Sequence, residues 1–162
     1  MPVMAWVSIG SNVEPARHIR MAVTRLREHF GPLRLSSVYR NRAEGFEGAD
    51  FLNLVAGFAT RETPQGIVDE LEKLHVAAGR VRGGERFAPR TLDLDLLLYG
   101  DQVIASPQVP RRDITEYSFV LGPLAEVAPE LRHPLSGETI AGLWQRFDKA
   151  RHPLHRVPLP LS

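Results

Sequence analysis

The chain has 162 residues, 43% of them hydrophobic, so it is long enough to bury a substantial core within one domain. Its formal net charge of +1 gives no overall field that would attract nucleic acid or an anionic membrane. It has no cysteine, which excludes disulfides, thiolate metal sites and cysteine nucleophiles and is typical of a reducing, cytoplasmic setting. We therefore expect a single domain over residues 1–162, without a signal peptide or membrane span.

Hydrophobic periodicity and turn residues predict the elements of the first hundred residues. In chain order we expect a strand at 3–9, a helix at 15–29, strands at 33–39 and 51–60, a helix at 63–78 and a strand at 91–99. The turn residues Gly10, Ser11 and Asn12 are expected to end the first strand. This βαββαβ order predicts an α+β, ferredoxin-like core, with an antiparallel sheet and helices on one face.

Smaller pieces follow that core. We expect a short helix at 121–126, ended by Pro129, a further helix at 139–147, and an extended, proline-containing tail at 152–162. These segments are interpreted as C-terminal additions to the ferredoxin-like core.

Two carboxylates lie two residues apart in the fourth predicted strand, at Asp93 and Asp95. Side chains at this spacing leave the same face of a strand. Two adjacent hard oxygen ligands suit Mg²⁺, which keeps several waters and takes further oxygens from phosphate groups. The alternative is a solvated strand face whose carboxylates pair with nearby arginines.

A basic, glycine-containing loop directly precedes these carboxylates. It carries one acid, Glu85, and four arginines: Arg80, Arg82, Arg86 and Arg90. All but two of the 20 basic residues of the chain are arginines, whose planar guanidinium donates two parallel hydrogen bonds to phosphate oxygens. A solvated basic loop is the alternative, but the loop and the acidic pair together favour a site for a polyphosphate with Mg²⁺.

Other nucleotide motifs are absent from the sequence: there is neither a G-x-x-x-x-G-K-[ST] loop nor a G-x-G-x-x-G turn. Phe51, Asn53 and Phe119 are candidates for binding a flat heterocycle, because aromatic faces stack on such rings and an amide offers a donor and an acceptor to their edge. Phenylalanines in apolar stretches are more often core residues, so this interpretation depends on family context.

The motifs together resemble the 6-hydroxymethyl-7,8-dihydropterin pyrophosphokinase family of folate biosynthesis. The resemblance covers about residues 3–147. Its most specific part is the run R-F-A-P-R-T-L-D-L-D from Arg86 to Asp95, preceded by G-R-V-R at 79–82; G-S-N at 10–12, D-F-L-N at 50–53 and A-P-E-L at 128–131 are similar too.

The resemblance implies transfer of the pyrophosphoryl group of ATP to the pterin hydroxymethyl group, with release of AMP. Asp93 and Asp95 would hold two Mg²⁺ ions, with Arg82 and Arg90 as further catalytic residues. The resemblance also implies ATP contacts from Arg80, Arg82, Arg86, Arg90 and Arg111, and pterin contacts from Gly45, Phe51, Asn53, Asp93 and Phe119. Loops at 40–49 and 80–89 would close on ATP, and the enzyme would act as a cytoplasmic monomer without a nucleic-acid partner.

Several positions depart from the family pattern. His75 stands where a glutamate is common, Arg111 where a histidine is usual, Tyr117 where an arginine is usual, and Gly83 where a basic residue is frequent. These departures leave open a paralogue acting on a different pterin. Two further alternatives are a non-catalytic nucleotide- or pterin-binding protein and an RNA-binding module, since the split βαβ plan hosts many such modules. Against the last, the fourth strand carries carboxylates where a base-stacking platform needs aromatic rings.

Overall fold

The computed structural model describes residues 2–42, 50–79, 92–150 and 153–161. Its elements are β1 (Val3–Ser11), α1 (Pro15–Phe30), β2 (Arg34–Leu35), β3 (Val38–Asn41), β4 (Phe51–Thr60), α2 (Pro64–Ala77), β5 (Asp93–Tyr99), α3 (Asp113–Glu116), α4 (Ser118–Val127), α5 (Ile140–Arg146) and β6 (His155–Val157).

The strands form one antiparallel sheet in the order β5-β1-β4-β3-β6, and the short β2 also pairs with β4. If β2 and β3 count as one interrupted strand, the order β5-β1-β4-β3 is that of a βαββαβ ferredoxin-like core. The predicted fold class is therefore confirmed.

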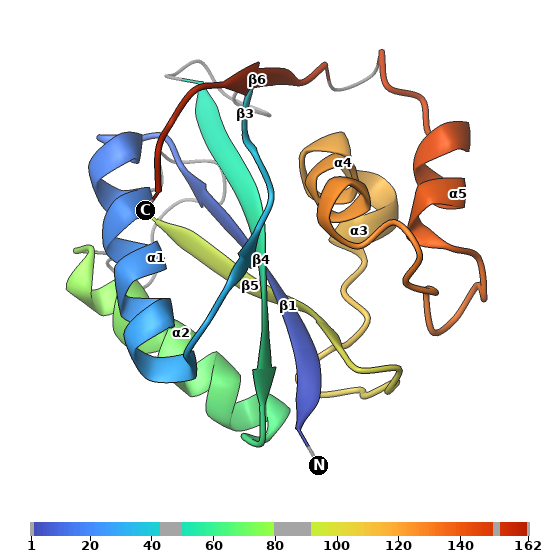
Figure 1. Cartoon of the computed structure of the whole chain (residues 1–162), viewed down its shortest axis with the longest axis horizontal. Helices are drawn as coiled ribbons and strands as arrows, with labels where there is room; N and C mark the ends of the chain where they lie inside the picture. Colours follow the sequence, from blue (N-terminus) through green and yellow to red (C-terminus); the bar gives the residue numbers. More distant parts are fainter. Residues whose placement is uncertain (1, 43–49, 80–91, 151–152, 162) are drawn as a thin grey trace.

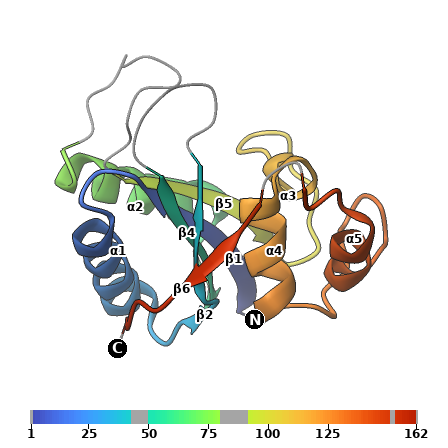
Figure 2. The same cartoon turned by 90° about the horizontal axis from the view of Figure 1, so that it is seen from above.

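Helices cover both faces of the sheet (Figures 1 and 2). The core helices α1 and α2 pack on one face, over an apolar cluster that includes Ile9, Leu54 and Leu94. The added helices α3, α4 and α5 cover the opposite face, over a second cluster around Trp6 and Leu121. None of the described helices is both long enough and apolar enough to cross a membrane.

Three strands differ from their predicted bounds. β5 begins at Asp93 instead of 91, and the other two differ for reasons that lie in their partners. β1 continues through Gly10 to Ser11, because β4 pairs with both of these residues and β5 pairs with Gly10. The strand expected at 33–39 is interrupted at Ser36. There the Val55 N–H donates to Ser36 Oγ and the Ser36 N–H donates to the Val55 carbonyl, each at 2.9 Å.

The C-terminal additions also differ in detail from the sequence prediction. The helix expected at 121–126 runs from Ser118 to Val127 and contains Pro123. The predicted tail includes the short strand β6, which pairs with β3 and crosses toward α1 (Figure 1). Arg20 on α1 donates to the Pro160 carbonyl at 3.3 Å, so the tail connects the sheet edge to a core helix.

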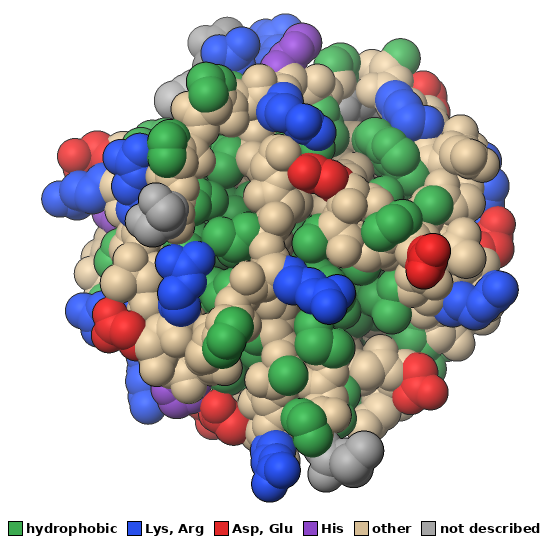
Figure 3. Space-filling model, in the orientation of Figure 1, with side chains coloured by type: hydrophobic (Ala, Val, Ile, Leu, Met, Phe, Trp, Pro, Cys, Tyr) green, Lys and Arg blue, Asp and Glu red, His purple; other side chains and the backbone are tan. Residues whose placement is uncertain are grey.

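The face of the molecule that is turned toward the viewer in Figure 1 carries basic and acidic side chains interspersed with apolar ones (Figure 3). This mixture agrees with the nearly neutral formal charge of the whole sequence.

Candidate functional site

A row of four residues crosses the sheet at one end. Tyr39 of β3 pairs with Asn53 of β4, Asn53 pairs with Gly10 of β1, and Gly10 pairs with Asp93 of β5. Directly paired residues present their side chains on the same face of a sheet. The row therefore places the Asn53 amide and the Asp93 carboxylate on one face, separated by a residue without a side chain.

The second carboxylate belongs to the next row on this face. Asp95 pairs with Ser8, which in turn pairs with Val55. Both aspartates are partly buried, whereas Leu94 between them is buried on the opposite face, in the cluster under α1 and α2. The predicted alternation of the strand is thus confirmed, and the two carboxylates face the side of the sheet that α3 and α4 cover.

Arg111 lies beside these carboxylates. Its backbone N–H donates to the Leu97 carbonyl of β5 at 3.0 Å, which fixes the start of the side chain next to the strand. Its Nη2 lies 3.5 Å from Asp95 Oδ1, and its Nε lies 3.3 Å from Asp113 Oδ1. Burial lowers the pKa of Arg111, but Asp95, Asp113 and Asp93 outweigh burial and hold it above its ordinary value. The guanidinium therefore stays charged.

This arrangement fits a divalent cation. Among the described residues, three carboxylates face the Arg111 guanidinium, so this part of the site carries an excess of negative charge. Among the residues that the structure describes, no group of three or more acidic, histidine or cysteine side chains could enclose a metal. Two carboxylates with waters and substrate phosphates suit Mg²⁺, which is rarely bound by a complete protein cage.

Asn53 is held by a neighbour that sequence reasoning missed. Its Nδ2 donates to Asn41 Oδ1, and Asn41 Nδ2 donates to the Arg42 carbonyl at 3.1 Å. A Cβ built on Gly10 would lie 2.6 Å from Asn53 Oδ1, so a larger residue there would displace the amide. Asn41 therefore orients Asn53, and Gly10 leaves it room.

The aromatic candidates lie on the same side of the sheet. Phe51 pairs with Asn41, two residues before Asn53 on β4, and so shares its face. Phe119 is on α4, which packs against β4 and β3. Tyr117 stacks on Phe119, with ring centroids 4.8 Å apart and planes inclined by 18°. The residue that departs from the family pattern at 117 thus contacts a predicted ring-binding residue directly.

Part of the predicted site lies outside the described residues. This applies to the pterin contact Gly45 and to the phosphate contacts Arg80, Arg82, Arg86 and Arg90, together with most of the loops expected to close. Asp113 is a site residue that the sequence reasoning missed. It is the first residue of α3, two residues after Arg111. An acidic residue at this place in the sequence was the signal from which a helix start close to Arg111 could have been predicted.

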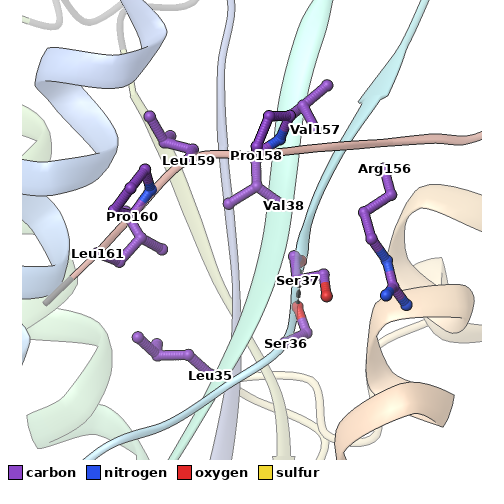
Figure 4. Close-up of a pocket in the computed structure, with 10 residues that line it drawn as sticks. All are labelled: Leu35, Ser36, Ser37, Val38, Arg156, Val157, Pro158, Leu159, Pro160 and Leu161. Atoms are coloured by element: carbon purple, nitrogen blue, oxygen red, sulfur yellow. Dashed lines mark hydrogen bonds between the residues drawn. The ribbon is translucent and has the colours of Figure 1, made fainter.

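The structure also contains a pocket of about 440 Å³ away from these residues (Figure 4). It lies between residues 35–38 and the C-terminal segment 156–161, and its lining is mostly apolar, with Arg156 at one end. None of its lining residues is a candidate site residue, so we assign the chemistry to the carboxylate face of the sheet.

Comparison with known proteins gives sequence matches along most of the chain. The family model for 7,8-dihydro-6-hydroxymethylpterin-pyrophosphokinase (HPPK) matches residues 6–129. The 2-amino-4-hydroxy-6-hydroxymethyldihydropteridine pyrophosphokinase of Pseudomonas aeruginosa is 38% identical over 136 residues, covering 80% of this chain and 83% of that protein. The protein of the same name from Synechocystis is 35% identical over 149 residues, covering 89% and 76%.

Solved structures share the fold. A Plasmodium falciparum HPPK-DHPS structure superposes with a TM-score of 0.72 at 11% identity, and covers 90% of this chain but 45% of that one. An HPPK-DHPS structure in complex with substrates gives a TM-score of 0.73 at 12% identity, covering 93% and 44%. The chain thus spans less than half of these longer proteins, and at this identity the likeness concerns the fold alone. The sequence matches, however, confirm the resemblance, and the chain belongs to the 7,8-dihydro-6-hydroxymethylpterin-pyrophosphokinase family.

Proposed function

We propose that this chain transfers the pyrophosphoryl group of ATP to 6-hydroxymethyl-7,8-dihydropterin and releases AMP, as a step of folate biosynthesis. The hydroxymethyl oxygen forms a bond to the β-phosphorus, and the bond from that phosphorus to the α–β bridging oxygen breaks. The hydroxyl proton passes to solvent, and the electron pair of the broken bond leaves with AMP. Such chemistry requires positioning and charge neutralisation more than covalent help from the protein.

The carboxylate pair is the observation that carries this proposal. Asp93 and Asp95 share one face of β5, at the end of the sheet where Asn53 lies. They would hold two Mg²⁺ ions, which when bound neutralise phosphate oxygens and polarise the phosphorus under attack. Arg111 would contact the nucleotide phosphates as a permanent cation, and the same role is proposed for the arginines of the preceding segment: Arg80, Arg82, Arg86 and Arg90.

The acceptor would lie on the same face of the sheet. Asn53 would hydrogen-bond the edge of the pterin, with its amide oriented by Asn41. Phe51 and Phe119 would flank the ring, because stacked aromatic faces bind flat heterocycles. Gly45 and Asp93 would complete the pterin contacts. These roles rest on the face that the described residues share and on the family to which the chain belongs.

The direct test is incubation with Mg-ATP and 6-hydroxymethyl-7,8-dihydropterin, followed by separation of the nucleotides. We expect AMP and the pyrophosphorylated pterin in equal amounts, and no product when EDTA removes the metal. Formation of ADP, or no turnover by a folded sample, would refute the proposal. ATP binding without AMP would instead indicate a non-catalytic binding protein.

A paralogue acting on a different pterin is the second candidate. The stacked pair of Tyr117 and Phe119 favours it, because an aromatic ring replaces the usual arginine beside a proposed pterin wall. Comparison of kcat/KM across pterins with different 6-substituents separates the two candidates. We further propose that the enzyme works as a single-domain monomer in the cytoplasm, which light scattering and cell fractionation test.

A further inference from the structure

β5 lies at an edge of the sheet, with β1 on one side only. Alternate N–H groups of an edge strand point away from the neighbouring strand and need partners elsewhere. Leu94 lies between Asp93 and Asp95, and its backbone N–H donates to His75 Nε2 at 2.9 Å. Leu94 is 2% exposed and His75 5% exposed, so this hydrogen bond is shielded from water. Without a partner, this buried N–H would cost free energy comparable to that of a lost hydrogen bond.

Both nitrogens of the His75 ring have partners. Because a backbone N–H only donates, Nε2 accepts from Leu94 and the ring proton belongs on Nδ1. That nitrogen lies 3.0 Å from Glu72 Oε2, one turn earlier on α2. The tautomer follows from this network, which orients the ring toward β5 and fixes it against the helix.

We infer that His75 is a positioning residue for the metal-binding carboxylates. This inference rests on the proposed function. The Leu94 nitrogen belongs to the peptide plane that joins it to Asp93, so holding the nitrogen also fixes the direction in which the neighbouring aspartates leave the strand. Mg²⁺ requires nearly ideal octahedral geometry, so small displacements of its ligands weaken binding. A histidine thus acts here at a position that departs from the expected family pattern.

A matched pair of variants tests this role. The glutamine in His75→Gln can place an acceptor oxygen about where Nε2 lies, whereas the methionine in His75→Met has similar length but no comparable acceptor. Mn²⁺ serves as the metal probe, titrated in the presence of a non-hydrolysable ATP analogue and followed by electron paramagnetic resonance. Amide exchange of Leu94, followed by NMR, reports the hydrogen bond itself. Neither measurement requires turnover.

We expect His75→Met to weaken Mn²⁺ binding by about tenfold and His75→Gln by about twofold or less, as for other residues that orient metal ligands. Leu94 amide exchange should accelerate by at least about tenfold in His75→Met and remain slow in His75→Gln. In turnover, the KM for Mg²⁺ should rise in His75→Met, with kcat nearly restored at saturating metal.

A purely stabilising role gives a different result. His75→Met would then lower the melting temperature and accelerate Leu94 exchange while binding Mn²⁺ like the parent protein, and that outcome overturns the inference. If His75→Met does not fold, His75→Asn is the second variant: it stays polar but is too short to reach Leu94, so unchanged Mn²⁺ affinity there also overturns it. Absence of AMP formation by the parent protein would refute the proposed function instead, leaving these binding measurements interpretable.

Discussion

Arg111 bridges two carboxylates, with Nη2 at 3.5 Å from Asp95 Oδ1 and Nε at 3.3 Å from Asp113 Oδ1. The proposed phosphate-binding cation thus contacts one of the proposed metal ligands. This position departs from the expected family pattern, and its arginine keeps a full charge at every physiological pH.

The contribution of this cation can be measured with Arg111→Met. We expect the KM for ATP to rise by about tenfold or more, because a hydrogen bond to a charged group contributes about 1.5–3 kcal/mol. Arg112→Met is the matched control, since Arg112 is the exposed neighbour of Arg111. An unchanged KM in Arg111→Met would mean that Arg111 only neutralises Asp95 and Asp113.

The metal assignment predicts loss of turnover in Asp95→Asn. The substitution keeps the shape of the side chain but replaces a charged ligand oxygen with an amide. We expect Mg²⁺-dependent AMP formation to fall by about 1,000-fold or more, because metal stabilisation of the developing charge amounts to several kcal/mol. Circular dichroism should show an unchanged fold. Asp101→Asn, in the exposed turn after β5, should leave the rate intact. Near-normal activity of Asp95→Asn would remove Asp95 from the metal site.

Gly10 and Gly57 offer a contrast between a site effect and a core effect. A Cβ on Gly10 would lie 2.6 Å from the end of the Asn53 side chain, which can move aside. Gly10→Ala should therefore raise the KM for the pterin by about tenfold, because displacement of the Asn53 amide removes one hydrogen bond to the pterin. The variant should lose little stability.

The same change at Gly57 should act through stability. A Cβ there would lie 2.3 Å from the buried Trp6 ring, which cannot move without disturbing the core. We expect Gly57→Ala to lower the free energy of unfolding by about 1–3 kcal/mol, measured by urea denaturation. If Gly10→Ala loses stability while keeping its pterin KM, the proposed position of the pterin beside Asn53 is wrong.

Glu126 of α4 gives a prediction about pH. Its carboxylate accepts from the Tyr39 hydroxyl at 2.6 Å and from the Ser37 hydroxyl at 2.8 Å. Burial alone would raise the pKa of Glu126. The hydrogen bonds that it accepts, of which the one from Tyr39 has the largest effect, bring its pKa below the ordinary value of 4.5. A carboxyl with a lowered folded-state pKa stabilises the fold above its unfolded pKa, and this stabilisation is lost as pH falls through the folded-state value.

Tyr39→Phe should therefore destabilise the protein in a pH-dependent way. We expect a loss of about 1.5 kcal/mol at neutral pH, the value of one hydrogen bond to a charged group. The difference from the parent should shrink as pH falls below 4.5 and Glu126 becomes protonated. In Tyr99→Phe the lost bond is to the Glu62 backbone carbonyl, at 2.7 Å in the parent, so its effect should not vary with pH. Equal pH profiles for both variants would contradict this role of Glu126.

Elements with local signals were predicted well from the sequence. α2 begins at Pro64 after Thr63, whose Oγ1 accepts from the Gly66 N–H at 3.0 Å, as a helix cap should. β4 has the predicted bounds, Phe51–Thr60. α4 was predicted too short, at 121–126 instead of Ser118–Val127, although the predicted span already included Gly122 and Pro123, which both disfavour helix. Packing overrides that preference, and Gly122 leaves room for Trp144 and Leu154 to approach.

The site was predictable where its chemistry lies in neighbouring residues of the chain. Spacing alone placed Asp93 and Asp95 on one strand face. Asn41 was missed because its role arises from a contact with Asn53, which lies on a different strand. Asp113 was missed although it follows its partner Arg111 by only two residues. His75 was identified only as a departure from the family pattern, since its partner Leu94 lies on a different element. Sequence spacing does not encode such contacts.

The row formed by Tyr39, Asn53, Gly10 and Asp93 has a consequence for thermal inactivation. Its members belong to four strands of one sheet, so the distances between them depend on the pairing of those strands. Heating cannot separate Asn53 from Asp93 without breaking the pairing of β1 with its neighbours. A one-residue slip of β4 would turn Asn53 toward α1 and α2. Inactivation that requires separation of the central residues of this row should therefore coincide with global unfolding.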